Sequence, residues 1–450
     1  MGQSGLGRCS RRGAKRMNLV CIMLDTLRYD HIAALGKPWV HTPNLDRFAS
    51  EAAVFERAYV GSFPTIPCRT DLFTGRYTFP HRGWSPLPRE EPVLATLLHG
   101  AGYTSQLIVD TYHMLKDGYH FDRGFDGWEF IRGQEHDRYI VDASLAPTHP
   151  APMEKMPRLG DRYLRNVAAR RVEEDWFAPQ VMRAAVRWLE RNRGLDRFLL
   201  WVDCFDPHQP WDPPRHYVDL YDPGYQGDEV IYPTPGPVDY LTPAEMRHVQ
   251  ALYAGEVTMV DRWVGEVLSA IDRLGHRRDT LVVVMSDHGC YMDYPGDQGR
   301  VEKPWPLYEA VAHEVLLLRH PEGWGAGRRF GQLVQPVDLL PTLLEAAGVP
   351  APAQLEGQSL LNLLRPDGGP REWGRRVAVS CPYRHGPTLT TERWSLVYQA
   401  DRPAHLFDLR ADRVQTVDLA SAHPEVVGEL ADAFRAFLAP RNPAAYRAPD

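Results

Sequence analysis

The chain has 450 residues, 44% of them hydrophobic, and a formal net charge of −7 at pH 7. This length suffices to bury a large core and suggests one large domain with a smaller one. The mild negative charge argues against nucleic acid as a partner, because no basic field dominates. No apolar stretch is long enough to cross a membrane, so no membrane partner is expected either.

Cysteine content and the N-terminal residues bear on the location of the protein. The six cysteines form no C-x-x-C pair, and Cys21 falls in an apolar segment typical of a buried strand. Reduced thiols are therefore expected, and not a disulfide framework. Residues 1–16 are basic and polar, and the apolar run at 19–24 is too short for a signal-peptide core. We expect a cytoplasmic protein whose residues 1–16 form a disordered extension, with Met17 as an alternative start.

Apolar runs and helical periods alternate from residue 17 to about residue 350. The first run, 18–24, is continuous, which is typical of a strand buried on both faces of a parallel sheet. The alternation predicts an α/β fold with a mostly parallel central sheet sandwiched by helices. The predicted strands are residues 18–24, 54–60, 103–109, 198–202, 280–285 and 315–318, and the predicted helices are 42–49, 94–99, 176–191, 242–274 and 337–347.

Other regions depart from this alternation. Residues 115–160 and 212–240 have no period and are predicted to be insertions that shape the substrate pocket. After residue 350, short strands in hairpin-like order and a final amphipathic helix predict a small α+β subdomain at 351–450, beside a catalytic domain at 17–350. The predicted elements of the subdomain are strands at 377–380, 394–398 and 405–409 and a helix at 424–438.

Polar residues follow several of the predicted strands. Asp25 ends the first strand, and Asp287 and His288 follow the strand at 280–285. Because ligands in open α/β sheets sit beyond the carboxyl ends of the strands, these groups are expected to meet at one edge. Two carboxylates and one imidazole form a ligand set for one divalent cation, with Thr65 as a further ligand. The residues leave the ion open between Ca²⁺, Mn²⁺ and Zn²⁺.

The stretch 62–76 is predicted to carry the nucleophile. Pro64 and Pro67 stiffen the chain around Thr65, and a helix is expected to start here and to stop at Gly75. A hydroxyl at a helix N-terminus faces free N–H groups that favour an anion. Binding to the cation would favour the alkoxide form of Thr65 and so make it a nucleophile.

Three more groups are expected to bind the non-bridging oxygens of a tetrahedral anion: Arg69, His208 and Lys303. Charge builds on those oxygens in the transition state, and the planar fork of an arginine matches two of them. Each candidate also has an ordinary structural explanation. Asp287 would serve as a helix cap, Lys303 as a solvated lysine, and His208 as a loop histidine bonded to backbone. Their shared position after strand ends favours the site.

Several segments match one known family. Residues 65–69 read T-x-P-x-R and residues 72–76 read L-x-T-G-R. They resemble the nucleophile motif of the sulfatase family, within the alkaline phosphatase superfamily, with Thr65 in place of the modified cysteine. The likeness extends over nearly the whole chain after Met17 and implies the family fold, and it also implies that His208 contacts substrate. Further matching segments are Thr42–Asp46, Pro207–Trp211, Ser286–Gly289, Lys303 with Tyr308–Glu309, Asp338–Leu344 and Leu406–Leu409.

Three positions depart from the family pattern. Thr26 stands where a second acidic ligand is usual after Asp25, and Thr111 stands where a lysine precedes His113. Thr65 replaces the cysteine, and threonine cannot be converted to formylglycine. The aldehyde-hydrate route is therefore closed. We expect direct attack by Thr65 on the central atom and hydrolysis of the ester formed on the enzyme, similar to the phosphodiesterase and phosphonate monoester hydrolase branches.

These residues predict a metal-dependent hydrolase of phosphate or phosphonate esters that acts on a small anionic ester. His113 is the candidate for protonation of the leaving group. A sulfatase that acts without formylglycine is an alternative, as is an inactive binding protein of the same fold. A second metal, held by Asp206 or His208 and by His385, is another alternative. Homo-oligomerisation stays open.

Overall fold

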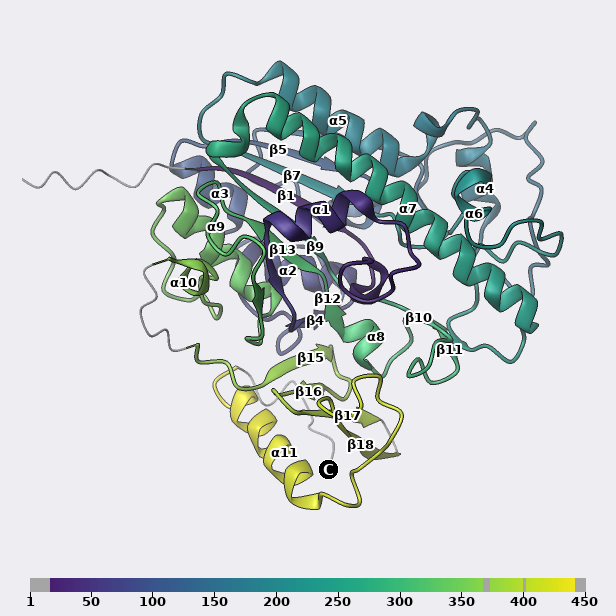
Figure 1. The fold of residues 1–450 in the computed structure, drawn as a ribbon. Coiled ribbons are helices and arrows are strands. Elements are labelled where there is room, and N and C mark those ends of the chain that lie inside the picture. Colours follow the sequence, from purple (N-terminus) through teal and green to yellow (C-terminus); the bar gives the residue numbers. More distant parts are fainter. Residues whose placement is uncertain (1–16, 367–372, 400–401, 442–450) are drawn as a thin grey trace, which may run out of the picture.

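An eight-stranded sheet forms the centre of the molecule (Figure 1). Its strands are β1 (Asn18–Leu24), β2 (Ala53–Phe55), β5 (Thr104–Val109), β6 (Gly127–Phe130), β7 (Phe198–Cys204), β9 (Thr280–Ser286), β13 (Leu316–Arg319) and β14 (Arg329–Phe330), in the order β14-β2-β13-β9-β1-β7-β5-β6. The structure is a computed structural model that describes residues 17–366, 373–399 and 402–441. The predicted extension at 1–16 therefore lies outside the described residues.

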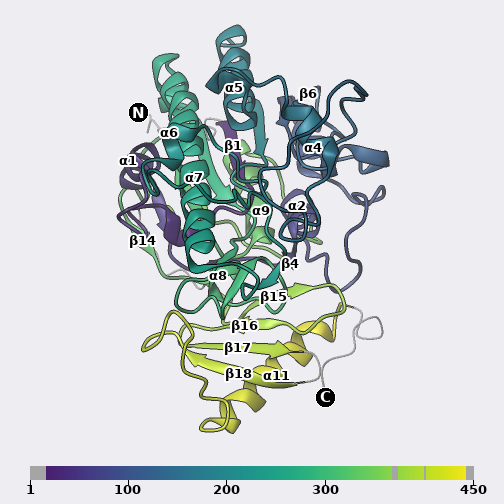
Figure 2. The same cartoon turned by 90° about the vertical axis from the view of Figure 1, so that its right-hand side faces the viewer.

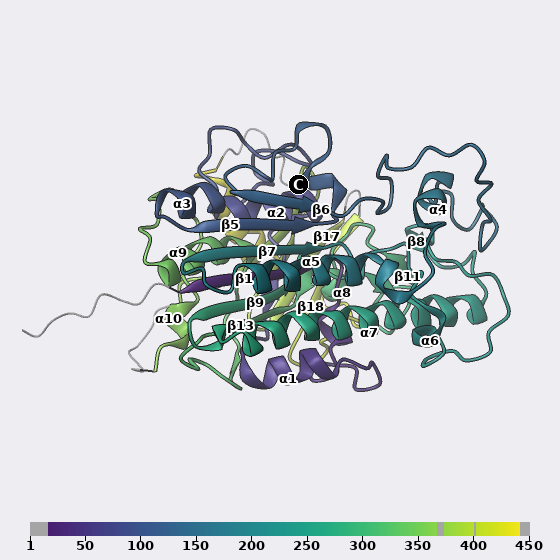
Figure 3. The same cartoon turned by 90° about the horizontal axis from the view of Figure 1, so that it is seen from above.

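The alternating side chains of β1 face two separate hydrophobic layers. Every residue of β1 is buried, as expected for a strand covered on both faces. Figure 3, seen from above, looks onto the face that α5 and α7 cover. One layer contains the helices α1 (Pro43–Glu51), α5 (Phe177–Arg191) and α7 (Pro243–Arg273), and the other contains α2 (Thr65–Thr74), α3 (Leu94–Gly100) and α9 (Leu339–Ala347).

The predicted fold class, with its mostly parallel sheet between helices, is confirmed. β1 pairs in parallel with both β7 and β9, and β5 pairs in parallel with β7 and β6. β13 is antiparallel to β9 and to β2, because the chain between β9 and β13 contains no long crossover helix. β6 was not predicted, since it lies within the 115–160 insertion and has little apolar alternation.

A second sheet lies below the first and packs against helix α11 (Figure 2). Its order is β18-β17-β16-β15-β4. Strand β4 comes from the N-terminal part of the chain and pairs in parallel with β15, so the loop before Thr65 is joined to this sheet. The division at residue 350 stays a prediction. The elements are β4 (Ser62–Phe63), β15 (Ala378–Pro382), β16 (Thr388–Thr390), β17 (Trp394–Gln399), β18 (Arg402–Asp408) and α11 (Pro424–Leu438).

Shorter elements complete the described part of the chain. They are the strands β3 (Ala58–Tyr59), β8 (Gly236–Pro237), β10 (Tyr291–Met292), β11 (Arg300–Glu302) and β12 (His313–Glu314), and the helices α4 (Asp161–Val167), α6 (Arg215–Val218), α8 (Glu309–Ala312) and α10 (Leu361–Leu364). Within the described residues, no helix combines the length and the apolar character that a membrane span requires.

Candidate active site

The carboxyl ends of the central strands bring acidic side chains together. Asp25 follows β1, Asp203 lies near the end of β7, and Asp287 follows β9. The register pairs Met23 with both Asp203 and Met285, which places the three carboxylates at the same edge of the sheet. All three side chains are fully buried.

Asp25, Asp287 and His288 lie within reach of one ion. One possible ligand atom from each lies within 4.8 Å of the other two. His288 Nδ1–H donates to the carbonyl of Gly289 at 3.0 Å, so Nε2 keeps its lone pair, and Nε2 is buried without a hydrogen-bond partner. Burial lowers the pKa of His288 to about 4, which keeps the ring neutral at pH 7. A neutral, oriented imidazole is the state that binds a metal ion.

The turn after His288 requires a glycine because another backbone segment passes close to it. The N–H of Gly289 donates to the carbonyl of Val311 at 2.9 Å. A Cβ on Gly289 would lie 2.2 Å from the carbonyl oxygen of Ala310. A side chain at this position would therefore push the turn away from α8 and displace the two candidate ligands that precede it.

The Arg69 guanidinium is enclosed by the three carboxylates. Nε and Nη2 donate to Asp203 Oδ1 at 3.1 and 2.7 Å. Nη1 donates to Asp287 Oδ2 at 2.7 Å and to the carbonyl of Thr65 at 3.3 Å. Nη2 also lies 3.1 Å from Asp25 Oδ2. One side chain thus connects the start of α2 with all three strand ends.

These contacts differ from the expectation that Arg69 binds substrate oxygens. Arg69 is fully buried, and each of its three nitrogens has a carboxylate partner, because a buried guanidinium needs opposite charge around it. A direct contact with an anion would have to replace one of these pairs. Substrate binding by Arg69 therefore stays a prediction.

The site contains more negative than positive charge. Three carboxylates face the guanidinium of Arg69 and the half-buried ammonium of Lys303, while His288 is neutral. Burial raises the pKa of Asp25, and the neighbouring Asp287 carboxylate raises it further. Asp25 Oδ2 accepts no hydrogen bond from any described residue. This oxygen, which lies 3.1 Å from the charged Arg69 Nη2, and the bare Nε2 of His288 are two buried atoms without a hydrogen bond to the described residues that together fit a divalent cation.

Thr65 is the first residue of α2, after Pro64 as the N-cap. Its side chain is 2% exposed, and its hydroxyl makes no hydrogen bond to another described residue. Asp71 fixes the loop on both sides of the helix, since it accepts the N–H groups of Ser62 at 2.8 Å and Thr78 at 2.7 Å. The hydroxyl of Thr65 therefore stands at the helix N-terminus, as the sequence predicted.

His208 lies in the segment after β7, where its ring stacks on Phe205 with centroids 4.0 Å apart. Its Nδ1–H donates to the carbonyl of Gln209, which leaves the lone pair on Nε2. Burial, and then the charge of Lys303, hold the pKa of His208 well below its ordinary value. Lys303 Nζ donates to Thr26 Oγ1 at 3.2 Å, so Lys303 is anchored next to Asp25.

His113 is held by a buried carboxylate that the sequence did not single out. Its Nε2 lies 3.0 Å from Glu135 Oε2, and Tyr232 donates its hydroxyl to the other oxygen of Glu135. Trp84 meets the ring of His113 edge-on at 4.9 Å. His113 Nδ1 is buried and has no hydrogen-bond partner among the described residues. The imidazole is therefore oriented with Nδ1 as the nitrogen available to a ligand.

A second group of possible ligands consists of Asp110, Cys204 and Asp206. Donors from the protein already occupy its carboxylates. The N–H of Phe205 donates to Asp110 Oδ1 at 2.7 Å, and Gln134 Nε2 donates to Asp206 Oδ1 at 2.6 Å. We therefore assign this group a structural role at the ends of β5 and β7.

A second metal would need other residues. His208 and His385 belong to no group of three possible ligands in the part of the chain that the structure describes. His385 lies between β15 and β16, with its ring 5.5 Å from that of Trp305. No group of possible ligands in the described residues joins Asp206, His208 and His385. The two-metal alternative therefore stays a prediction.

Glu302 is a titrating group next to Lys303. It is 1% exposed and accepts a hydrogen bond from Gln209, and burial raises its pKa from 4.5 to about 7. In the unfolded chain the same carboxyl loses its proton at lower pH, so this group lowers the free energy of unfolding as the pH rises from about 4.5 to about 7. Glu302→Gln is expected to remove this dependence, which amounts to at most about 3 kcal/mol.

Urea unfolding at acidic, neutral and mildly alkaline pH measures the effect. Glu302→Gln should gain stability relative to the unmodified protein only above the acidic range. The exposed Glu429→Gln serves as the control and should leave the pH dependence unchanged. Equal pH dependence in all three proteins would contradict the prediction.

Comparisons with known proteins show which family the chain resembles. The sulfatase family model matches residues 17–349, and the model named "N-sulphoglucosamine sulphohydrolase, C-terminal" matches residues 296–433. The chain belongs to the sulfatase family. Within the alkaline phosphatase superfamily it is a sulfatase-family hydrolase.

Relatives of the sulfatase-family chain include both sulfatases and phosphonate hydrolases. An arylsulfatase of Clostridium perfringens is 26% identical over 77% of this chain and 78% of its own length. The multifunctional alkaline phosphatase superfamily protein PehA of Trinickia caryophylli is 25% identical, over 90% and 91%. The phosphonate monoester hydrolase of Agrobacterium radiobacter has a TM-score of 0.74 at 21% identity, over 94% and 95% of the two chains.

The positions that depart from the sulfatase pattern have specific partners. Thr26 Oγ1 donates to Asp25 Oδ1 at 2.7 Å, and Thr111 Oγ1 donates to Asp203 Oδ1 at 2.8 Å. Both threonines thus supply a hydroxyl donor to a buried carboxylate. Asp203 and Glu135 were missed in the sequence. Asp203 follows the predicted strand at 198–202 but belongs to none of the motifs, and Glu135 lies in an aperiodic segment.

Proposed function

We propose that this sulfatase-family hydrolase cleaves phosphate or phosphonate esters through a covalent ester on Thr65. The observation that carries the proposal is a threonine hydroxyl at the start of buried helix α2, whose first backbone carbonyl accepts from the same Arg69 that pairs with Asp25 and Asp287. The first N–H groups of a helix favour negative charge, as the attacking oxygen and a phosphoryl group both require. Threonine cannot form formylglycine, so direct attack is the chemistry left to it.

Sulfatase-family enzymes generally bind a divalent metal ion. In this chain Asp25, Asp287 and His288 would hold it, and Ca²⁺, Mn²⁺ and Zn²⁺ are the candidates. When bound, such an ion supplies positive charge that favours the ionised hydroxyl and offsets the charge of the ester. Arg69 keeps both carboxylates in place through its pairs with Asp25 and Asp287.

The residues of the chain provide for two displacement steps. Lys303 donates to the non-bridging oxygens of the ester, and His208 joins it only in the form that carries a proton on Nε2 as well as on Nδ1. Thr65 attacks phosphorus through its ionised oxygen, which has lost its proton to solvent, as the bond to the leaving oxygen breaks. His113, protonated on both ring nitrogens for this step, gives the leaving oxygen its Nδ1 proton and becomes neutral. A water molecule then attacks phosphorus from the opposite side, the bond to Oγ1 breaks, and His113 takes a proton from the water. Glu135 orients His113 throughout, through its bond to Nε2.

A sulfate ester hydrolase that works without formylglycine is the second candidate. The match to the sulfatase model and the arylsulfatase relative favour it. A sulfuryl group has the same tetrahedral shape and less charge, so the same residues would bind it. An inactive binding protein is the third candidate, and the retained cluster of Asp25, Arg69, Asp287 and His288 argues against it.

Substrates that share one leaving group separate the first two candidates. The purified protein is assayed on bis(4-nitrophenyl) phosphate, 4-nitrophenyl phenylphosphonate and 4-nitrophenyl sulfate, so that differences in kcat/KM report the central atom. We expect the phosphorus esters to be the better substrates. The sulfate as the best substrate would replace our proposal with the second candidate, and no hydrolysis of any of them would favour the third.

Removal of the metal is expected to abolish hydrolysis, with a loss of at least about 100-fold, because the charge of the anionic ester is then uncompensated. Dialysis against a chelator, then titration with Ca²⁺, Mn²⁺ or Zn²⁺, identifies the ion that restores activity. Elemental analysis should give one ion per chain, and Asp287→Asn should lower that content. Full activity in protein free of divalent metal would refute the assignment.

The remaining expectations are part of the same proposal. The partner is a small anionic ester, and nucleic acid and membranes are not partners. A cytoplasmic location is proposed from the reduced state expected of the thiols.

A further inference from the structure

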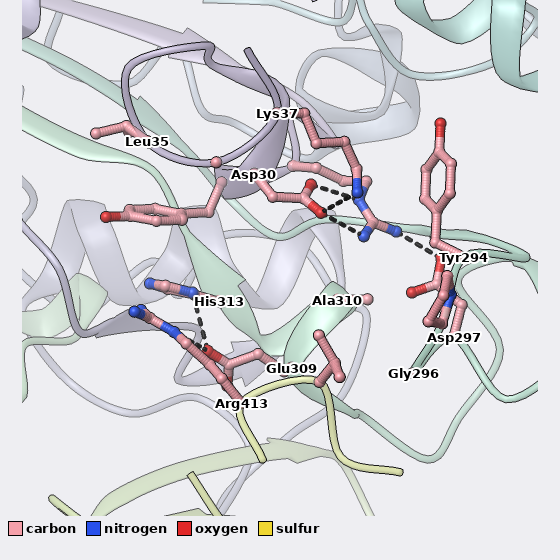
Figure 4. Close-up of a pocket in the computed structure, with 15 residues that line it drawn as sticks. Asp30, Leu35, Lys37, Tyr294, Gly296, Asp297, Glu309, Ala310, His313 and Arg413 are labelled. Carbon is pink, nitrogen blue, oxygen red and sulfur yellow. Dashed lines mark hydrogen bonds and ion pairs between the residues drawn. The ribbon is translucent and has the colours of Figure 1, made fainter. Parts of the chain in front are cut away.

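A cavity of about 370 Å³ opens beside Asp30, Lys37, Tyr294 and Arg413 (Figure 4). It is bounded by the segment after β1, the loop between β10 and β11, helix α8 and the segment after β18. None of its lining residues belongs to the candidate catalytic or metal residues. Its walls come from both the central sheet region and the C-terminal sheet region, and such junctions are frequent ligand sites.

The carboxylates on one side of the cavity already accept hydrogen bonds from the protein. Asp30 Oδ1 accepts from Arg28 Nε at 2.8 Å and lies 2.7 Å from His31 Nδ1. Asp30 Oδ2 accepts from Arg28 Nη2 at 2.9 Å and lies 3.1 Å from Lys37 Nζ. Asp297 Oδ2 accepts from Arg28 Nη1 at 2.7 Å. Both oxygens of Asp30 are therefore occupied, while Asp297 has donors on Oδ2 and keeps Oδ1 as an acceptor.

Glu309, on the opposite side, is satisfied in the same way. His313 Nδ1 lies 3.0 Å from Glu309 Oε1, and the Tyr59 hydroxyl lies 3.2 Å from Oε2. The ring of His313 is stacked against Tyr29, with centroids 3.9 Å apart, so the histidine cannot turn toward the cavity without breaking this stack. The acidic residues of the wall are thus structural.

Two cations retain unused donors. Lys37 Nζ has Asp30 as its ion-pair partner and lies 4.0 Å from the centre of the Tyr294 ring, while an ammonium has three donors. The side chain of Arg413 is 54% exposed, and its Nε is 3.9 Å from the nearest oxygen of Glu309. Figure 4 shows Lys37 and Arg413 on opposite sides of the cavity. Apart from the Asp30 pair of Lys37 and the bond from Arg413 Nη2 to the carbonyl of Glu56 at 3.2 Å, the N–H groups of these two cations remain available to an anion.

The rest of the wall is apolar. Leu35, Ala310 and Val414 line the cavity, together with the rings of Tyr29 and Tyr294. A hydrated inorganic ion would leave this surface uncovered, whereas a ligand with a hydrocarbon or aromatic body would bury it. The volume is that of a small-molecule site.

We propose that this cavity binds a small organic anion, with one carboxylate or phosphonate group on an aromatic or apolar body, between Lys37 and Arg413. The proposal is independent of the hydrolytic function. It names a second ligand site on the protein, separate from Thr65 and the candidate metal residues.

Calorimetric titration of the full-length protein with benzoate and with phenylphosphonate tests the proposal. We expect saturable binding of at least one probe. Tighter binding of benzoate would indicate a carboxylate site, and tighter binding of phenylphosphonate would indicate a phosphonate site. The double variant Lys37→Met with Arg413→Met should bind at least tenfold more weakly. Arg187→Met removes an exposed arginine paired with Glu129 and should bind as the unmodified protein does.

Two further single variants test whether the probe binds in this cavity or in the candidate catalytic site. Val414→Glu adds a carboxylate at a position 52% exposed, so it should weaken binding tenfold without loss of an internal contact. Lys303→Met alters the candidate catalytic site and should leave benzoate binding unchanged. The proposal would be overturned if Lys303→Met abolished binding while the double variant preserved it. It would also be overturned if neither probe bound at millimolar concentration.

Discussion

Replacing Thr65 with valine is expected to lower kcat by about 10⁴-fold or more, because the proposed attacking atom is removed. Valine has nearly the shape of threonine, and the Thr65 hydroxyl makes no hydrogen bond to a described residue, so the stability of α2 should hardly change. Steady-state kinetics on the best substrate, with thermal unfolding in parallel, measure both effects. Thr65→Ser keeps the oxygen and should retain part of the activity.

Thr70 and Thr74 on the same helix provide matched controls. Thr70 Oγ1 donates to the carbonyl of Ile66 at 3.0 Å, and Thr74 Oγ1 donates to that of Thr70 at 2.7 Å. Thr70→Val and Thr74→Val remove a hydroxyl from equally buried positions and should change kcat by less than about threefold. If Thr65→Val hydrolysed the ester as fast as these two controls, Thr65 would not be the nucleophile.

Asp203→Asn is expected to lower the free energy of unfolding by about 3–5 kcal/mol, since it leaves the buried Arg69 charge short of one partner. Asp203 accepts hydrogen bonds from Arg69 Nε and Nη2, from Thr111 at 2.8 Å and from Trp201 Nε1 at 3.2 Å. An asparagine amide has one acceptor oxygen where the carboxylate has two, so it cannot accept all of these bonds. Urea unfolding at pH 7 gives the difference. Activity should also fall, because Arg69 connects Asp203 to the other two carboxylates.

Asp219→Asn is the matched control for this substitution. Asp219 pairs with Arg215 at 2.7 Å, with 45% of its side chain exposed. Solvent screens such a pair, so its loss should cost less than about 1 kcal/mol. If Asp203→Asn and Asp219→Asn changed the free energy of unfolding equally, the buried charge of Arg69 would not need Asp203 as a partner.

Local sequence patterns predicted most of the fold. The final helix was predicted at 424–438 and is found at Pro424–Leu438, because its Pro start and its amphipathic period are both local signals. The direction of β13 could not be predicted, since it depends on how the chain returns to the sheet. β6 lies in a segment without period, and its pairing with β5 provides the stabilisation that its own sequence lacks.

The candidate site was predicted only in part. Asp25, Asp287 and His288 could be expected together because each follows an apolar strand, and the sheet register brings them to one edge. Asp203 also follows a predicted strand, at 198–202, but no motif singled it out, and the structure extends β7 past it to Cys204. The enclosure of Arg69 by three acids depends on contacts between residues more than a hundred positions apart, which no local pattern encodes.

The pairing of β4 with β15 affects how the protein acquires its function during synthesis. Cys381 pairs with Ser62, three residues before Thr65, so the backbone that leads into the proposed nucleophile gains this neighbour only when more than four fifths of the chain has left the ribosome. A nascent chain that stops between residues 303 and 381 contains every proposed catalytic side chain but lacks this support. Premature termination after residue 350 would therefore give a polypeptide with an intact set of reactive groups and an unanchored attacking loop.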